Sequence, residues 1–142
     1  MITLIKKWEG CKLKAYLDGG GVWTIGYGTT FYPDGTRVKE GDTCTQEQAD
    51  YWLQGHANDL VFELLNEVKV TLNANQIKAL VCFIYNIGMG AFKKSTMLRL
   101  INDGKVLEAS EQFIRWNKDN GVVVPGLTNR RLDEKKLFNT PV

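Results

Sequence analysis

The sequence lacks paired cysteines, clustered histidines and long apolar runs, and each absence excludes a class of protein. Its three cysteines are an odd number without paired spacing, which argues against a disulfide framework and fits a reducing compartment of synthesis. One histidine is too few for the usual zinc sites, so we expect no metal centre. No apolar run approaches the roughly 18 residues of a membrane span, and the N-terminus shows no secretion signal. We therefore expect no stable membrane insertion.

The length and composition fit one folded domain, which we expect to cover residues 1–142. The hydrophobic fraction of 44% is ordinary for a chain that buries a core. The sequence contains no internal repeat, low-complexity tract or flexible linker. A monomer is the simplest expectation.

Charge is unevenly distributed along the chain. Residues 1–71 hold seven Lys or Arg against ten Asp or Glu, a balance of −3, and residues 72–142 hold eleven against six, a balance of +5. A basic C-terminal half suits an anionic polymer or a phospholipid surface. The plainer interpretation, which we favour, is a solvated helical surface with extra lysines. A net charge of +2 is too small to predict a nucleic-acid partner, and we expect none.

The first part of the chain predicts a short helix followed by a small antiparallel sheet. Apolar residues recur at helical spacing over residues 1–10, and Gly10 is a suitable terminator. From residue 12 to 44 the pattern favours short strands, with glycine-rich and Pro-Asp-Gly turns and a returning strand at 36–38. In the main strand, one face should hold Trp23, Ile25 and Tyr27, and the other Thr24, Gly26 and Gly28. We expect the glycine face to admit a bulky substrate.

The remainder predicts helices, and the whole chain therefore an α+β fold. Thr45 opens a capping box for a connecting helix over about 45–68, which carries His56 on or near its surface. A helical lobe should cover about 70–142 and be joined by the N-terminal helix. Its helices are expected from Asn73 to the glycines at 88 and 90, from Ser95 to 101, over 105–117 and over 127–138, with a loop at 121–126.

Two carboxylates flank the turn before the main strand. Glycoside hydrolysis commonly uses one protonated acid and one ionised carboxylate, held in different environments. Glu9 lies at a helix end beside Trp8, which favours the protonated form, and Asp18 lies in an open glycine-rich turn, which favours the charged form. The hydroxyl of Thr24 could orient a water molecule. Spacing alone favours a plainer interpretation, with Glu9 as a surface charge and Asp18 bonding to its own turn.

The segment from Glu9 to Thr30 resembles the active-site segment of bacteriophage-type lysozymes, glycoside hydrolase family 24. The family pattern is a glutamate, eight residues, an aspartate, five residues and a threonine within T-I-G-Y-G, and this sequence keeps all of it. Residues 73–102 resemble the family's central helix and residues 121–131 its C-terminal signature. The sequence departs from the family at Thr29, where a histidine is common, and in the hairpin at 31–44, which only part of the family shares.

The resemblance implies a lysozyme-like fold, with a sheet lobe beside a helical lobe and a cleft between them. It implies a muramidase that hydrolyses the β-1,4 bond between N-acetylmuramic acid and N-acetylglucosamine of peptidoglycan with inversion, without a cofactor. Glu9 would be the general acid, and Asp18 and Thr24 would position or activate the attacking water. Such an endolysin would be synthesised in the host bacterial cytoplasm and act in the cell wall or periplasm after release.

Four further residues would bind substrate by the same resemblance: Thr30, Tyr85, Asn86 and Ser95. The alternatives stay open: Tyr85 as a core aromatic, Asn86 as a helix C-cap and Ser95 as an N-cap. Arg130 and Arg131 are expected to pair with helix carboxylates rather than with a ligand.

Three rival functions remain. A zinc amidase or a Cys–His peptidase would need more than the single histidine and would need a motif beside a cysteine. A non-catalytic peptidoglycan-binding protein could use the same scaffold, because a fold does not fix a function. The intact Glu9, Asp18 and Thr24 spacing argues against that last alternative.

Overall fold

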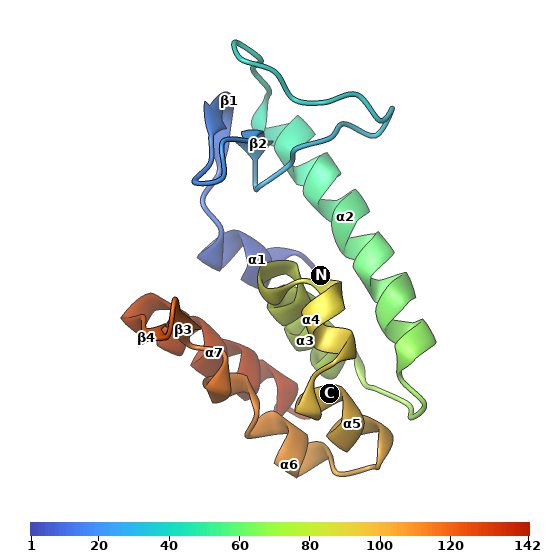
Figure 1. The fold of residues 1–142 in the computed structure, drawn as a ribbon. Helices are drawn as coiled ribbons and strands as arrows, with labels where there is room; N and C mark the ends of the chain where they lie inside the picture. Colours follow the sequence, from blue (N-terminus) through green and yellow to red (C-terminus); the bar gives the residue numbers. More distant parts are fainter. The chain divides into compact units, whose positions relative to one another are not determined.

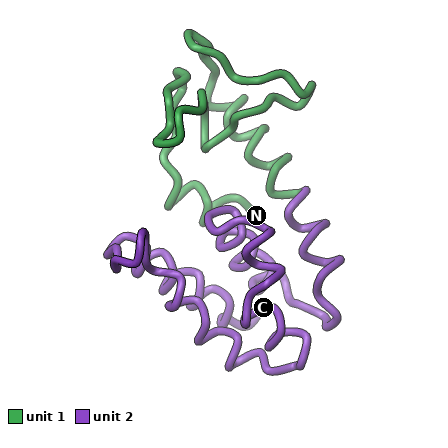
Figure 2. Tube along the Cα trace, viewed as in Figure 1, with its two compact units in different colours: residues 1–58 green, residues 59–142 purple.

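The computed structural model describes residues 1–142, and the chain divides into two compact units, residues 1–58 and 59–142 (Figure 2). The predicted α+β fold is confirmed, since helices dominate and the strands form two small antiparallel sheets (Figure 1). No helix combines the length and apolar character that a bilayer span requires. The two units are described in turn.

The first unit contains a short helix, a two-stranded sheet and the beginning of a long helix (Figure 1). The elements are α1 (Thr3–Trp8), β1 (Lys12–Leu17), β2 (Trp23–Gly26) and the N-terminal part of α2 (Gln46–Glu67). In the sheet, Tyr16 faces Thr24 across the ladder, and the register shifts between Lys12 and Tyr16. The predicted N-terminal helix is shorter than expected, because Glu9 already has extended angles (φ −93°, ψ 132°).

The segment between β2 and α2 forms turns rather than the expected returning strand. The predicted Pro-Asp-Gly turn is present, where Asp34 Oδ1 accepts hydrogen bonds from the amide and hydroxyl of Thr36 at 2.9 and 2.7 Å. Residues 36–38 contribute only an isolated bridge between Phe31 and Arg37. The Tyr32 hydroxyl donates to Asp42 at 2.7 Å. Two backbone hydrogen bonds accompany the bridge, from the Tyr32 amide to the Thr36 carbonyl at 2.9 Å and from the Val38 amide to the Thr30 carbonyl at 3.0 Å, but the pairing is too short to form a strand.

Gly26 packs against α2, and the expectation that it faces substrate is wrong. Its φ is +64°, which is in the left-handed region, so the side-chain alternation of β2 ends there. A Cβ added to Gly26 would lie 3.3 Å from the Cβ of Ala49 and 3.6 Å from its Cα. Thr24, assigned to the same open face, is only 3% exposed. Both faces of this short strand are covered, which a period of two does not reveal.

The second unit consists mainly of helices packed around aromatic side chains. The elements are α3 (Ala74–Ile87), α4 (Met89–Lys93), α5 (Thr96–Asn102), α6 (Val106–Ser110), η1 (Phe113–Arg115), β3 (Lys118–Asp119), β4 (Val122–Val123) and α7 (Pro125–Phe138). Phe83 of α3 lies at the centre and meets Phe92, Phe113 and Trp116 in edge-to-face contacts with ring centroids 5.1–6.5 Å apart. Helix α3 packs directly against α7. The last turn of α3 is thereby fixed by both its core face and α7.

The predicted helix starts are confirmed by their hydrogen bonds. Thr45 and Gln48 form a reciprocal capping box, with distances of 2.9 and 3.1 Å. Asn73 and Gln76 form a second, and Ser95 Oγ accepts from the Leu98 amide at 3.1 Å. These caps fix where α2, α3 and α5 begin.

Three predicted boundaries in the second unit are wrong. Gly88 ends α3, but Gly90 lies inside α4. The helix expected over 105–117 ends as α6 at Ser110 and is followed by the one-turn η1. The expected loop at 121–126 contains β4 and the start of α7. Asn120 and Gly121 have φ values of 50° and 79°, which suit a tight two-residue hairpin turn between β3 and β4.

We predict that Gly26→Ala lowers the thermal unfolding midpoint by several degrees, because a Cβ is strained at positive φ and too close to Ala49. The matched control is Gly55→Ala, since Gly55 lies inside α2 with open space around it. That control should stabilise the protein or leave the midpoint unchanged. A Gly26→Ala midpoint equal to or above the wild-type value would show that the position is not sterically closed.

Candidate active site

Glu9 caps the C-terminal end of α1 and begins the connection to β1. Its amide donates to the Ile5 carbonyl at 2.8 Å, so its backbone position is fixed by the last turn of the helix. Ile5 is fully buried and anchors that turn in the core. The side chain of Glu9 is half-buried. The backbone of Glu9 therefore has a defined position, and its side chain is partly accessible to solvent.

Asp18 closes the turn between β1 and β2. Its Oδ1 accepts hydrogen bonds from the amides of Gly20 at 2.8 Å and Val22 at 2.9 Å. The alternative interpretation of Asp18 as a turn residue is therefore correct for this oxygen. The side chain is exposed, and Oδ2 accepts no hydrogen bond from the protein. One carboxylate oxygen thus holds the turn, and the other is available to a ligand or to water.

Thr24 is hydrogen-bonded to Val22, the residue that also holds Asp18. Its hydroxyl donates to the Val22 carbonyl at 2.9 Å, and this carbonyl also accepts the Asp18 amide at 3.0 Å. The backbone of Val22 therefore fixes both Asp18 and Thr24. The Thr24 oxygen still has lone pairs that can accept a hydrogen bond. Because the residue is only 3% exposed, a water held there would lie against the strand.

Tyr16 is a fourth member of this group, and the sequence reasoning missed it. It pairs with Thr24 across the sheet and lies two residues before Asp18. Burial raises the pKa of its phenol first, and the negative charges of Asp18 and Glu9 raise this pKa further. Both carboxylates are therefore close enough to act on one side chain. The available signal was the strand period of two, which places Tyr16 and Asp18 on one face.

Within the first unit, Val22 thus holds Asp18 and Thr24, and the charges of Asp18 and Glu9 both act on Tyr16. Thr30, also in this unit, is half-buried, and its carbonyl accepts the Val38 amide at 3.0 Å. No three side chains of the metal-ligating types lie close enough to share an ion. The chemistry available here is that of two carboxyl groups, a hydroxyl and a phenol. One carboxyl group can donate a proton while the other accepts one from water.

The other three predicted site residues lie in the second unit, at the end of α3 and the start of α5. Tyr85 is half-buried, as its alternative interpretation allows. Ser95 is the N-cap of α5, and its hydroxyl also donates to the Phe92 carbonyl at 2.7 Å. Asn86 is exposed and is not the C-cap, which is Gly88. Its Oδ1 accepts a hydrogen bond from Arg131 Nη2 at 2.9 Å.

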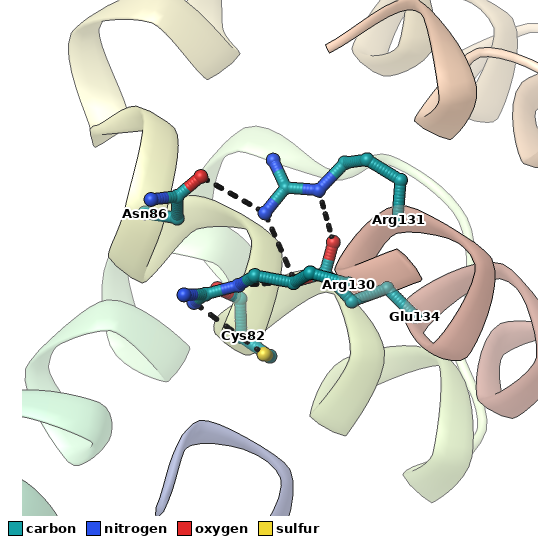
Figure 3. Close-up of polar contacts among 5 residues, drawn as sticks. All are labelled: Cys82, Asn86, Arg130, Arg131 and Glu134. Carbon is teal, nitrogen blue, oxygen red and sulfur yellow. Dashed lines mark hydrogen bonds and ion pairs between the residues drawn. The ribbon is translucent and has the colours of Figure 1, made fainter. Parts of the chain in front are cut away.

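Asn86 belongs to a polar cluster on the contact between α3 and α7, shown in Figure 3. Arg130 Nε and Arg131 Nε lie 3.2 and 2.7 Å from the two carboxylate oxygens of Glu134, so the predicted pairing of both arginines is confirmed. Burial raises the pKa of Glu134 and lowers that of Arg131, and the attraction between them opposes both shifts.

The chain is similar in sequence to proteins of one known family. A model of the phage lysozyme family matches residues 6–134. The chain is 41% identical over 143 residues to an endolysin of Acyrthosiphon pisum secondary endosymbiont phage 1, covering 98% of this chain and 94% of that one. It is 40% identical over 141 residues to an endolysin of Bacillus phage PZA, covering 98% of this chain but only 53% of that protein. The chain therefore spans about half the length of the PZA relative.

Among solved structures, the fold is similar to the muramidase domain of SpmX from Asticaccaulis excentricus. The TM-score is 0.88 at 38% sequence identity, and the match covers 99% of this chain and 95% of that one. With the family match over residues 6–134, these similarities show that the chain belongs to the phage lysozyme family.

Proposed function

We propose that this chain is a muramidase that hydrolyses the β-1,4 bond between N-acetylmuramic acid and N-acetylglucosamine in peptidoglycan, with inversion. The observation that carries the proposal is the backbone of Val22, which holds Asp18 and Thr24 side by side in the unit that also contains Glu9. Family membership supports it, and so do the endolysin and muramidase relatives.

In this mechanism Glu9 is the general acid. Its carboxyl group donates a proton to the glycosidic oxygen as the bond to C1 breaks, so the leaving sugar departs as an alcohol. Glu9 is half-buried and directly follows α1, so its side chain has limited contact with water. Tyr16, whose raised pKa keeps the phenol neutral, contributes a dipole near the reacting groups but no net charge.

Asp18 and Thr24 prepare the water that attacks C1 from the opposite face. The water donates one hydrogen bond to the free Oδ2 of Asp18 and the other to the Thr24 oxygen. Because the Thr24 proton is used by the Val22 carbonyl, this oxygen can only accept from the water. A lone pair of the water is then directed at C1, and Asp18 takes the proton that the attack releases.

The proposed substrate contacts lie in both units. Tyr85 offers an aromatic face to a pyranose ring, and Asn86 offers an amide. Ser95 and Thr30 offer hydroxyl groups, although the Ser95 hydroxyl already donates once and accepts once within the protein. We further propose that the protein acts as a monomer on the bacterial cell wall, after synthesis in the host cytoplasm.

The exchange Glu9→Gln tests the acid directly, because glutamine keeps the shape of the side chain but cannot donate an acidic proton. We expect wall-lytic activity to fall by about 10²–10⁴-fold with unchanged helical circular dichroism. The wall-lytic activity is measured by the loss of turbidity of a Gram-negative cell-wall suspension. The exposed Glu40 in the first unit offers a matched control, and Glu40→Gln should be as active as the wild type. Activity of Glu9→Gln within threefold of wild type would exclude Glu9 as the acid, and an inactive wild type would favour a binding protein.

Two measurements test the role of the attacking water: the anomeric configuration of the first product and the activity of Thr24 variants. In an inverting enzyme the two carboxyl groups flank a water, so the α-anomer should appear first from the β-linked glycan. NMR of the freshly released reducing end decides this. Thr24→Val should lower kcat strongly, because it removes the oxygen that accepts from the water, and Thr24→Ser should lower it less. The β-anomer as first product, or a glycosyl adduct on Asp18, would show that Asp18 is a nucleophile.

A further inference from the structure

The exposed side chain of Asn86 is anchored on a fully buried arginine. Arg131 has no exposed surface, and its Nη2 donates to Asn86 Oδ1 at 2.9 Å (Figure 3). A guanidinium group has donors only, so the amide of Asn86 must turn its oxygen toward Arg131. The Nδ2 group therefore faces away from Arg131, and it makes no hydrogen bond within the protein. The exposed end of this amide is a pure donor.

Arg131 is itself held on its edge and on its face. Its Nε lies 2.7 Å from Glu134 Oε1, and its Nη2 donates to Glu134 Oε2 at 3.4 Å. The ring of Phe83 lies 5.0 Å from the guanidinium carbon. Glu134 is fully buried and is bound in turn by Arg130, whose Nη2 donates to the Cys82 carbonyl at 2.9 Å. The guanidinium of Arg131 has no room to move without breaking one of these contacts.

Burying this cluster costs a large desolvation free energy, and its ion pairs contribute little net stability in return. Two guanidinium groups share one carboxylate, and Nη1 of Arg131 has no hydrogen-bond partner in the protein. The Nε–Oε1 pair is close but is not aligned as a hydrogen bond. Apolar residues of similar size often stabilise a core at least as well as buried ions do. A buried ionic cluster that ends on an exposed amide points to a role in orienting that amide.

We propose that Arg131, held by Glu134, is a positioning residue that presents Asn86 Nδ2 to the acetamido carbonyl oxygen of a bound sugar. This rests on the proposed function, in which Asn86 contacts the glycan. A donor-only group selects an acceptor, and the carbonyl of an N-acetyl group is an acceptor without a proton of its own. Both sugars of the proposed substrate carry such a group. Asn86 therefore recognises the N-acetyl substituent by donating a hydrogen bond from Nδ2. Arg131 fixes the orientation of the amide, so that Nδ2 rather than Oδ1 faces the sugar.

A double-mutant cycle on Asn86→Ala and Arg131→Met tests whether Arg131 acts through Asn86. Each single variant should raise KM for cell-wall glycan by about three- to tenfold with little change in kcat, which is the scale of one lost hydrogen bond. In the Asn86→Ala background, Arg131→Met should raise KM no further. The control is Phe138→Leu, a buried position in the same helix, which should lower stability without raising KM. Additive effects on KM would overturn the proposal.

The exchange Asn86→Asp separates positioning from stability. Aspartate still accepts from Arg131, now as an ion pair, so the unfolding midpoint should equal or exceed that of the wild type. Its second oxygen would replace the Nδ2 donor, so KM should rise at least as much as in Asn86→Ala. A wild-type KM for Asn86→Asp would contradict the donor role. If Arg131→Met does not fold, Arg131→Lys takes its place in the cycle, because lysine keeps the charge for Glu134 but lacks the second arm that reaches Asn86.

A separate measurement keeps this inference distinct from the proposed function. If the wild type releases no reducing ends from peptidoglycan, the proposed function fails. The orientation of Asn86 is then decided by its side-chain amide signals in a ¹H–¹⁵N spectrum, assigned by their absence in Asn86→Asp. Arg131→Met, or Arg131→Lys in its place, should shift these signals and bring them toward the values of a freely rotating amide. Unchanged signals would overturn the positioning role, whether or not the enzyme is active.

Discussion

The turn between β1 and β2 depends on a carboxylate that satisfies two backbone amides. Asp18 Oδ1 accepts from Gly20 and Val22, and the Asp18 amide and the Thr24 hydroxyl both donate to the Val22 carbonyl. Without these bonds the five-residue connection would have to leave polar backbone groups to water. The same bonds set the distance between Asp18 and Thr24. The turn is therefore both the end of the sheet and the frame of the candidate active site.

In the second unit a polar side chain is likewise held in place by hydrogen bonds, but its partners are buried ions rather than the backbone of a turn. Glu134 is shared by Arg130 and Arg131, and this arrangement crosses from α7 to α3 through Asn86 and the Cys82 carbonyl. In both units, a polar side chain that serves the surface is fixed by a partner whose geometry permits one orientation only. Rigid support of this kind is what positions reacting groups and substrate contacts.

The sequence predicted features that depend on near neighbours. The caps at Thr45, Asn73 and Ser95 follow from side chains that bond to the amide three residues later. The Asn120–Gly121 turn had an equally local signal, but the valines after it were interpreted as part of a loop. The spacing of Glu9, Asp18 and Thr24 identified the candidate site, because a resemblance preserves order and spacing even where physics alone leaves the choice open.

Features that depend on distant parts of the chain were not predictable in this way. The closed environment of Gly26 is created by Ala49, which is 23 positions away. The anchoring of Asn86 requires Arg131, which is 45 positions away on another helix. Local patterns identify which residues are polar or small, but only the packed helices decide which of them meet. Tyr16 combines both kinds of feature, since the strand period places it on the face of Asp18 but its pairing with Thr24 depends on the sheet register.

The role of Val22 has a consequence for how this protein would look in a mutational survey. Everything that Val22 supplies to Asp18 and Thr24 comes from its amide and carbonyl, and its side chain takes no part in these bonds. Substitution of Val22 by alanine would therefore leave all of these hydrogen bonds in place. Only a change to the main chain, such as proline or an amide-to-ester exchange, would reveal that the position is essential.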